Sequence, residues 1–186
     1  SEFWFGRSKE ISEAKKALRR YQAGHRGALV ITGDRISGKS FFANYIASEA
    51  LKGHTVYKIS PPGAGSCNPE PFRKAMEEAL DRSGSIDEML DSLPDNTVLI
   101  IDDMELWWEK APSGSMLLAR LFEMVEKHCE KILFILVSNK RAFRIMNQIM
   151  PFDDFALLTV ELPPFSSREL QEIILFRHKT SGFNLS

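Results

Sequence analysis

The feature that most constrains the fold of this chain of 186 residues is one glycine-rich segment, Gly33-Asp-Arg-Ile-Ser-Gly-Lys-Ser40. It matches the pattern G-x-x-x-x-G-K-[ST], the Walker A motif or P-loop, in which the backbone curls so that its N–H groups surround a polyphosphate. An apolar run, Ala28–Thr32, precedes the loop, and a helical pattern begins near its last residue. A strand, this loop and a helix N-terminus are the arrangement that phosphate binding needs, because the helix end adds a positive dipole. The segment therefore predicts a nucleotide-binding α/β domain.

Five short apolar runs rich in β-branched residues recur at intervals too long for hairpins. They are Ala28–Thr32, Thr55–Ile59, Val98–Asp102, Ile132–Ser138 and Phe155–Glu161. The third and fourth runs are continuous rather than alternating, which is typical of strands covered on both faces in a parallel sheet. Amphipathic helical stripes lie between the runs, whereas Ala111–Ser115 has the composition of a loop. We expect a three-layer α/β/α fold with a five-stranded parallel sheet.

Composition fits one globular domain and excludes several other classes. The 24 basic and 25 acidic side chains give a formal charge of −1, which offers no electrostatic case for nonspecific nucleic-acid binding over the whole surface. No apolar run reaches the roughly 18 residues of a membrane helix, so we expect no membrane segment. The two cysteines, Cys67 and Cys129, lie in no metal-binding spacing, and the chain opens without a signal-peptide pattern. We expect a cytoplasmic location.

The pattern changes after the fifth run. Leu162-Pro-Pro-Phe165 breaks regular structure, and Ser166-Ser-Arg-Glu169 is a capping box that opens an amphipathic helix. We therefore assign residues 1–162 to a P-loop nucleotide-binding core. Residues 163–186 are expected to begin a second, helical unit that this sequence truncates.

The loop and the third strand supply candidate ligands for a nucleotide and its metal. We expect the nucleotide to contact Gly33, Asp34, Arg35, Ile36, Ser37, Gly38, Lys39, Ser40 and Phe41. Lys39 would supply the cation for the β and γ phosphates, and Ser40 a hydroxyl for Mg²⁺. The third strand ends in Asp102-Asp103, the Walker B pattern. A carboxylate at that place holds Mg²⁺ through water, which is the role we assign to Asp102.

Other polar side chains at the strand ends are candidates for chemistry at the γ-phosphate. Asp103 is the first candidate to orient an attacking water, and Glu105 is the second. Asp103 has an alternative use as a cap for the segment that follows it. Ser138 and Asn139 place small polar groups after the fourth strand, and we expect Asn139 to sense the γ-phosphate. A turn that ends the strand explains these two residues nearly as well.

The order of these features resembles the additional-strand P-loop ATPases, in which one strand intervenes between the P-loop strand and the acidic strand. Trp4-Phe5-Gly6-Arg7-Ser-Lys-Glu10-Ile11 resembles the N-terminal segment of AAA+ and related STAND-type ATPases. Leu162-Pro-Pro-Phe165 and its capped helix are similar to the passage from their nucleotide core into a helical lid. The resemblance implies that Phe5 and Gly6 lie near adenine. It also implies Mg-ATP hydrolysis to ADP and phosphate that drives conformational change in a larger protein, with effector domains or protein partners outside this sequence.

Two residues depart from the AAA+ pattern. Ile36 stands where these ATPases usually carry glycine, and Asp103 stands where they usually carry glutamate. The shorter side chain loses roughly 1.5 Å of reach, and a misplacement of about 1 Å can lower a rate about a hundredfold. We therefore expect slow hydrolysis. The main alternative is a STAND-type switch, in which nucleotide binding orders the lid and hydrolysis is incidental.

Two further nucleotide-binding classes fit less well. Asn139-Lys140 begins like the guanine-reading N-K-x-D motif of GTPases, but Ala142 replaces the aspartate. A small-molecule kinase would explain the core but neither the N-terminal segment nor the capped C-terminal helix. Nucleic-acid contact by Lys140, Arg141 and Arg144 lacks support, because three charges near a turn are usually solvated.

Overall fold

The computed structural model of the chain describes residues 7–62, 68–108 and 112–181. These residues form a parallel sheet of five strands in the order β2-β3-β4-β1-β5, with every neighbouring pair parallel. The strands are β1 (Ala28–Gly33), β2 (Thr55–Ile59), β3 (Thr97–Ile101), β4 (Ile132–Asn139) and β5 (Ala156–Leu162). The expected α/β fold with a five-stranded parallel sheet is confirmed, and each strand lies within one residue of its predicted bounds.

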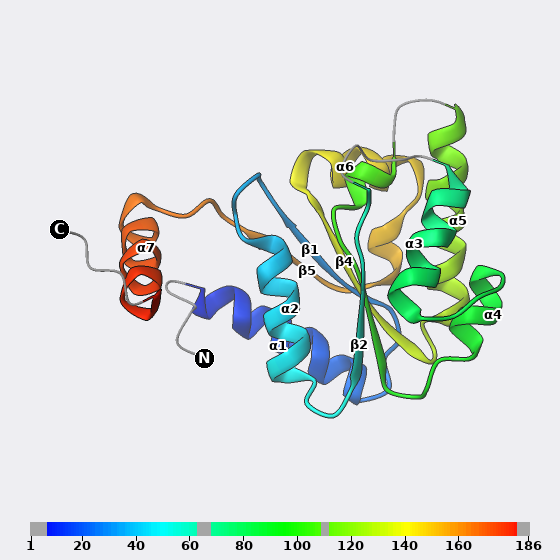
Figure 1. Cartoon of the computed structure of the whole chain (residues 1–186), viewed down its shortest axis with the longest axis horizontal. Helices are drawn as coiled ribbons and strands as arrows, with labels where there is room; N and C mark the ends of the chain where they lie inside the picture. Colours follow the sequence, from blue (N-terminus) through cyan, green and yellow to red (C-terminus); the bar gives the residue numbers. More distant parts are fainter. Residues whose placement is uncertain (1–6, 63–67, 109–111, 182–186) are drawn as a thin grey trace.

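Helices cover both faces of the sheet (Figure 1). The helices are α1 (Ser8–Gln22), α2 (Lys39–Ala50), α3 (Pro69–Leu80), α4 (Ile86–Asp91), α5 (Pro112–His128), α6 (Lys140–Ile149) and α7 (Ser167–Ser181), with two short 3-10 turns, η1 (Met104–Trp107) and η2 (Phe152–Phe155). We expected residues 112–115 to form a loop, but they begin α5. Proline suits the first turn of a helix, because the backbone N–H groups there have no helical acceptor. None of the helices described is both long and apolar enough to cross a membrane.

Side chains alternate between two apolar clusters, one on each face of the sheet. On one face, α1 and α2 bury residues such as Ala14, Phe42 and Ile46 against strand residues such as Leu29 and Ile31. These side chains point away from the other face because successive residues of a strand point to opposite sides. The sheet is therefore covered on both sides, as its continuous apolar strands predicted.

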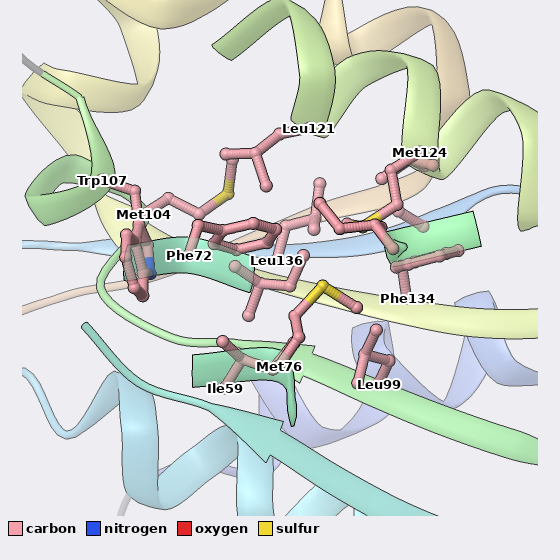
Figure 2. Packing of buried hydrophobic residues seen from close by; sticks show 14 of the residues in the cluster. Ile59, Phe72, Met76, Leu99, Met104, Trp107, Leu121, Met124, Phe134 and Leu136 are labelled. Carbon is pink, nitrogen blue, oxygen red and sulfur yellow. The ribbon is translucent and has the colours of Figure 1, made fainter. Parts of the chain in front are cut away.

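The second cluster lies beneath α3, α4, α5 and η1. Figure 2 shows Phe72 and Met76 of α3 beside Phe134 and Leu136 of β4. The Phe72 and Trp107 rings meet edge to face, with centroids 5.0 Å apart and planes at 88°. Full burial of one such large apolar side chain contributes about 2 kcal/mol to stability. This packing holds η1, and with it the acidic residues that precede η1, against the end of β3.

The last helix stands apart from the sheet (Figure 1). The Ser166 backbone N–H donates to the Glu169 carboxylate at 2.7 Å, and the Glu169 N–H donates to the Ser166 hydroxyl at 3.2 Å. The predicted capping box is therefore present at the start of α7. Hydrogen bonds from Ser166 also hold the pKa of Glu169 below its ordinary value.

Candidate nucleotide-binding site

The carboxyl ends of β1, β3 and β4 meet at one edge of the sheet, beside a pocket of about 540 Å³. Ligands of open α/β sheets bind at this edge, where neighbouring connections run to opposite faces. The pocket is lined by Arg35, Ile36, Gly38, Lys39, Ser40, Phe41, Asp103, Glu105, Leu106, Asn139 and Ala142. Six of the nine loop residues and all three candidate catalytic residues predicted from sequence are thus brought together. Gly33, the last residue of β1, and Asp34 and Ser37 of the loop are not among the lining residues. Phe5 and Gly6, predicted beside adenine, lie outside the described residues.

Two glycines shape the loop between β1 and α2. A Cβ atom on Gly33 would lie 2.5 Å from the Ser37 hydroxyl and 2.7 Å from the Leu162 carbonyl oxygen, so no larger residue fits there. Gly38 precedes α2 with a φ of 81°, a left-handed conformation that glycine adopts without strain. The loop therefore turns tightly enough to present its backbone N–H groups and the N-terminus of α2 to the pocket.

The lysine of the motif lies across this loop. Lys39 is buried, and its ammonium group donates to the Asp34 carbonyl oxygen at 3.0 Å. The ammonium group is therefore held close to the loop backbone. On binding, phosphate oxygens would replace the Asp34 carbonyl oxygen as its acceptor.

Ser40 and Asp102 form the pair that a magnesium ion would need. The Ser40 hydroxyl donates to Asp102 Oδ1 at 2.9 Å, and Asp102 is buried at the end of β3. Hydroxyl and carboxylate oxygens suit Mg²⁺, which commonly takes one or two protein ligands and completes its shell with phosphates and water. Within the described ranges no group of three or more His, Cys, Asp or Glu side chains is arranged so that it could hold a metal ion by itself. The residues present therefore fit a Mg²⁺ ion held largely by nucleotide phosphates.

Sequence reasoning missed a lysine at this pair. Lys58 Nζ of β2 lies 2.7 Å from Asp102 Oδ2. A charged residue inside a short apolar strand was the available signal. That Lys58 pairs with Asp102 became clear only from the strand register. β2 lies beside β3 with Lys58 opposite Ile100, two residues before Asp102.

Asp103 lines the pocket and adopts a left-handed conformation, with a φ of 45°. Its side chain makes no capping hydrogen bond to η1, so the capping role left open by the sequence is not observed. Burial raises the pKa of Asp103, and the neighbouring Asp102 and Glu105 raise it further against the opposing effect of Lys39 and Lys58. A carboxylate with a raised pKa is better suited to accept a proton from water.

Glu105 and Asn139 are both held by hydrogen bonds. Glu105 Oε2 accepts from the Ser138 hydroxyl at 3.0 Å and from the Asn139 backbone N–H at 2.8 Å. Asn139 Oδ1 accepts from the Arg141 N–H at 2.9 Å and so caps α6. β4 therefore runs directly into α6, with Asn139 as the N-cap of that helix, and the separate turn that the alternative interpretation expected is not present. Asn139 also lines the pocket, where its amide NH₂ is the group that would face an anion.

A buried arginine connects the loop to the segment that precedes the C-terminal helix. Arg7 is 1% exposed, and its guanidinium donates to the Ser37 carbonyl oxygen at 3.2 Å and to the Pro163 carbonyl oxygen at 2.6 Å. Its Cζ lies 4.4 Å from the centroid of the Phe165 ring, within the range of a cation–π contact. Burial lowers the pKa of Arg7. The role of Arg7 was not predicted, because its partners are backbone carbonyls on distant segments.

Comparison with known proteins supports the fold. No protein-family model and no curated protein matches the sequence. The Aeropyrum pernix ORC2 protein, solved in ADPNP-ADP complexes, is similar over 96% of this chain and 52% of its own, with 21% identity and a TM-score of 0.68. The Aeropyrum pernix ORC1 protein in complex with DNA matches over 97% and 51%, with 16% identity and a TM-score of 0.67. Domain III of the Thermotoga maritima replication initiation protein DnaA matches over 98% and 74%, with 17% identity and a TM-score of 0.61.

These matches show that the chain shares the fold of these proteins over nearly its whole length. The chain spans about half the length of the two ORC proteins. At such identities the comparison supports the architecture, and the roles of individual residues rest on the geometry of the site.

Proposed function

We propose that this chain is the Mg-ATP-binding domain of an AAA+ ATPase, which hydrolyses ATP slowly to ADP and phosphate and so changes the conformation of a larger protein. The hydrogen bond of 2.9 Å between Ser40 and Asp102 carries the proposal, because it joins the first turn of α2 to the end of β3 beside the P-loop. The ADPNP-ADP complexes of the similar ORC2 protein support an adenine nucleotide as the ligand. Effector domains or protein partners would lie outside this chain, and we infer a cytoplasmic location from its cysteine usage.

Each part of the ligand has its own residues in this proposal. The loop N–H groups and Lys39 bind the phosphates, and Phe5 and Gly6 lie against the adenine. Ser40 and Asp102 bind Mg²⁺, which when present neutralises phosphate charge. Because Lys39 is already buried and directed across the loop, little rearrangement is needed for binding.

Hydrolysis would depend on Asp103, which we assign as the residue that orients the attacking water. Its carboxylate lines the pocket and its raised pKa favours proton transfer. Glu105 is held by Ser138 and by the Asn139 backbone and therefore serves as a support for the end of β4. Asn139 then contacts the γ-phosphate through its NH₂ group.

A nucleotide-gated switch of STAND type is a second candidate, favoured by the contacts of Arg7. The same guanidinium bonds the P-loop at Ser37 and the segment before α7 at Pro163. A change in the loop on nucleotide binding would therefore reach α7 without hydrolysis.

Calorimetric titration with ATP, ADP and GTP in the presence of Mg²⁺ tests the binding site. We expect ATP and ADP to bind more tightly than GTP, and Lys39→Ala to weaken binding on the order of 100-fold, since it removes charge-assisted bonds to two phosphates. Lys16→Ala, on the exposed side of α1, is the matched control. Unaltered ATP binding by folded Lys39→Ala protein would show that the site is wrongly assigned.

Phosphate release by the purified protein separates the two candidates. An ATPase should lose about 100-fold in turnover with Asp103→Ala, while nucleotide affinity stays close to that of the wild type. Turnover that is unaffected by Asp103→Ala would remove the water-orienting role and favour the switch.

A further inference from the structure

The P-loop site contains one cation that its sequence motifs do not include. Lys58 comes from β2, the edge strand next to β3, and its ammonium group lies 2.7 Å from Asp102 Oδ2. Lys39, the cation of the motif, is bonded instead to the Asp34 carbonyl oxygen. The two lysines therefore serve different groups within one site.

Asp102 is the residue whose charge needs compensation. Its side chain is 4% exposed, and a carboxylate buried to that degree is costly unless it is paired. Asp102 Oδ1 accepts from the Ser40 hydroxyl at 2.9 Å and from the Asp103 backbone N–H at 3.0 Å. Neither donor carries a charge. Lys58 is therefore the group that balances the negative charge on Asp102 when no metal ion does so.

The position of Lys58 also allows it to separate from Asp102. Its side chain is 34% exposed, whereas that of Asp102 is buried. A lysine ammonium group is a point charge on a flexible four-carbon stem, so it can move into solvent without disturbing the strand. The same carboxylate can therefore be paired with Lys58 in one state and with a divalent ion in another.

We propose that Lys58 is a tethered cation that takes the place of Mg²⁺ at Asp102, so that nucleotide binds without the metal and Mg²⁺ displaces the ammonium group. This inference rests on the proposed function. With Lys58 present, the anionic phosphates meet a neutral Lys58–Asp102 pair. Without it, they meet an uncompensated carboxylate, which repels them until Mg²⁺ binds. Lys58 is thus a positioning residue that acts through Asp102.

The test is the ratio of the ADP dissociation constant in EDTA to that in Mg²⁺, measured by calorimetry. Lys58→Met should raise this ratio at least about tenfold above the wild-type value, which corresponds to about 1.4 kcal/mol. Lys58→Gln keeps a hydrogen-bond donor without the charge and should behave like Lys58→Met. Lys58→Arg restores the charge and should give a ratio close to wild type, as should Lys16→Met, which removes an exposed lysine of α1. Thermal unfolding identifies the variants that fold.

A second background tests the route through Asp102. In Asp102→Asn protein, adding Lys58→Met should leave the ratio unchanged, because there is no longer a charge for Lys58 to balance. An equal loss of affinity with and without Mg²⁺ in Lys58→Met would overturn the inference, since it would mean that Lys58 binds phosphate directly or only supports the fold. A wild-type protein that binds no nucleotide would overturn the proposed function and this inference together. Wild-type binding with an unchanged ratio in folded Lys58→Gln protein would overturn the inference alone.

Discussion

Ile36 is a strained residue that lines the pocket beside the P-loop. Its φ is 64°, in the left-handed region that β-branched residues rarely adopt. The side chain is 88% exposed, so packing does not offset the strain. Glycine would adopt the same conformation freely. The loop therefore adopts a left-handed conformation at a residue that is poorly suited to it.

Ile36→Gly should raise the free energy of unfolding by about 1 kcal/mol, because relief of strain outweighs the added flexibility of the unfolded chain. Urea denaturation of the purified protein measures this change. Ile36→Val, which remains β-branched, is the matched control and should leave stability within about 0.5 kcal/mol of the wild type. A stability loss in Ile36→Gly would mean that the isoleucine is not strained.

The residues of the site differ in how far sequence could place them. Lys39, Ser40 and Asp102 were predictable, because a loop motif and an acidic strand end specify chemistry at a known edge of a parallel sheet. Lys58 and Arg7 were not, because each meets its partners through packing between segments distant in sequence. Side chains that act across elements leave little local pattern.

At the scale of elements, strands were easier to predict than short helices. All five strands are apolar runs with few polar interruptions, and the structure places each within one residue of its predicted range. The helices α4 and α6 were not predicted. The α4 helix has only six residues, so its apolar stripe spans less than two turns. The α6 helix has ten residues, follows β4 without an intervening loop and buries Phe143 and Met146; Asn139, which we expect to contact the γ-phosphate, also caps it.

An ionic cluster fastens α4 to α5. Asp87 of α4 accepts from His128 at 3.1 Å and from Arg120 at 3.2 Å, and Lys127 lies 3.1 Å away. The hydrogen bond from His128, with those from Lys127 and Arg120, holds the pKa of Asp87 below its ordinary value although burial opposes this shift. The cluster therefore stabilises the folded state when Asp87 is ionised.

Asp87→Asn should lower the free energy of unfolding at pH 7 by about 1 kcal/mol, a value that allows for partial exposure to solvent. A depressed pKa in the folded state means that this stabilisation is complete above the ordinary pKa near 4 and is lost as pH falls below it. The difference between wild type and Asp87→Asn should therefore shrink as the pH falls below about 4. Urea denaturation across this range measures it, with exposed Asp95→Asn as control. A difference that is the same at pH 3.5 and pH 7 would exclude the cluster as its source.

At the scale of the whole molecule, one side chain joins the start of α1, the P-loop and the segment that follows β5. Arg7 precedes α1, and its guanidinium contacts Ser37 of the P-loop, Pro163 after β5 and the Phe165 ring. The Phe165 ring also lies 3.2 Å from the position that a Cβ atom on Gly38 would occupy. The P-loop and the segment leading to α7 therefore share one contact cluster. Any movement of the loop changes the surroundings of that segment.

Arg7→Met keeps much of the side-chain volume but removes both hydrogen bonds and the charge over Phe165. We expect amide hydrogens of α7 to exchange at least about tenfold faster in this variant, because a loss of about 1.4 kcal/mol in local stability changes an opening equilibrium tenfold. Hydrogen exchange followed by mass spectrometry measures this, with α5 as an internal reference whose exchange should not change. Adding Mg-ADP should slow exchange of α7 in the wild type but not in Arg7→Met, since the variant lacks the link between loop and helix. If ADP protects α7 equally in both proteins, coupling runs through the β5 backbone rather than through Arg7.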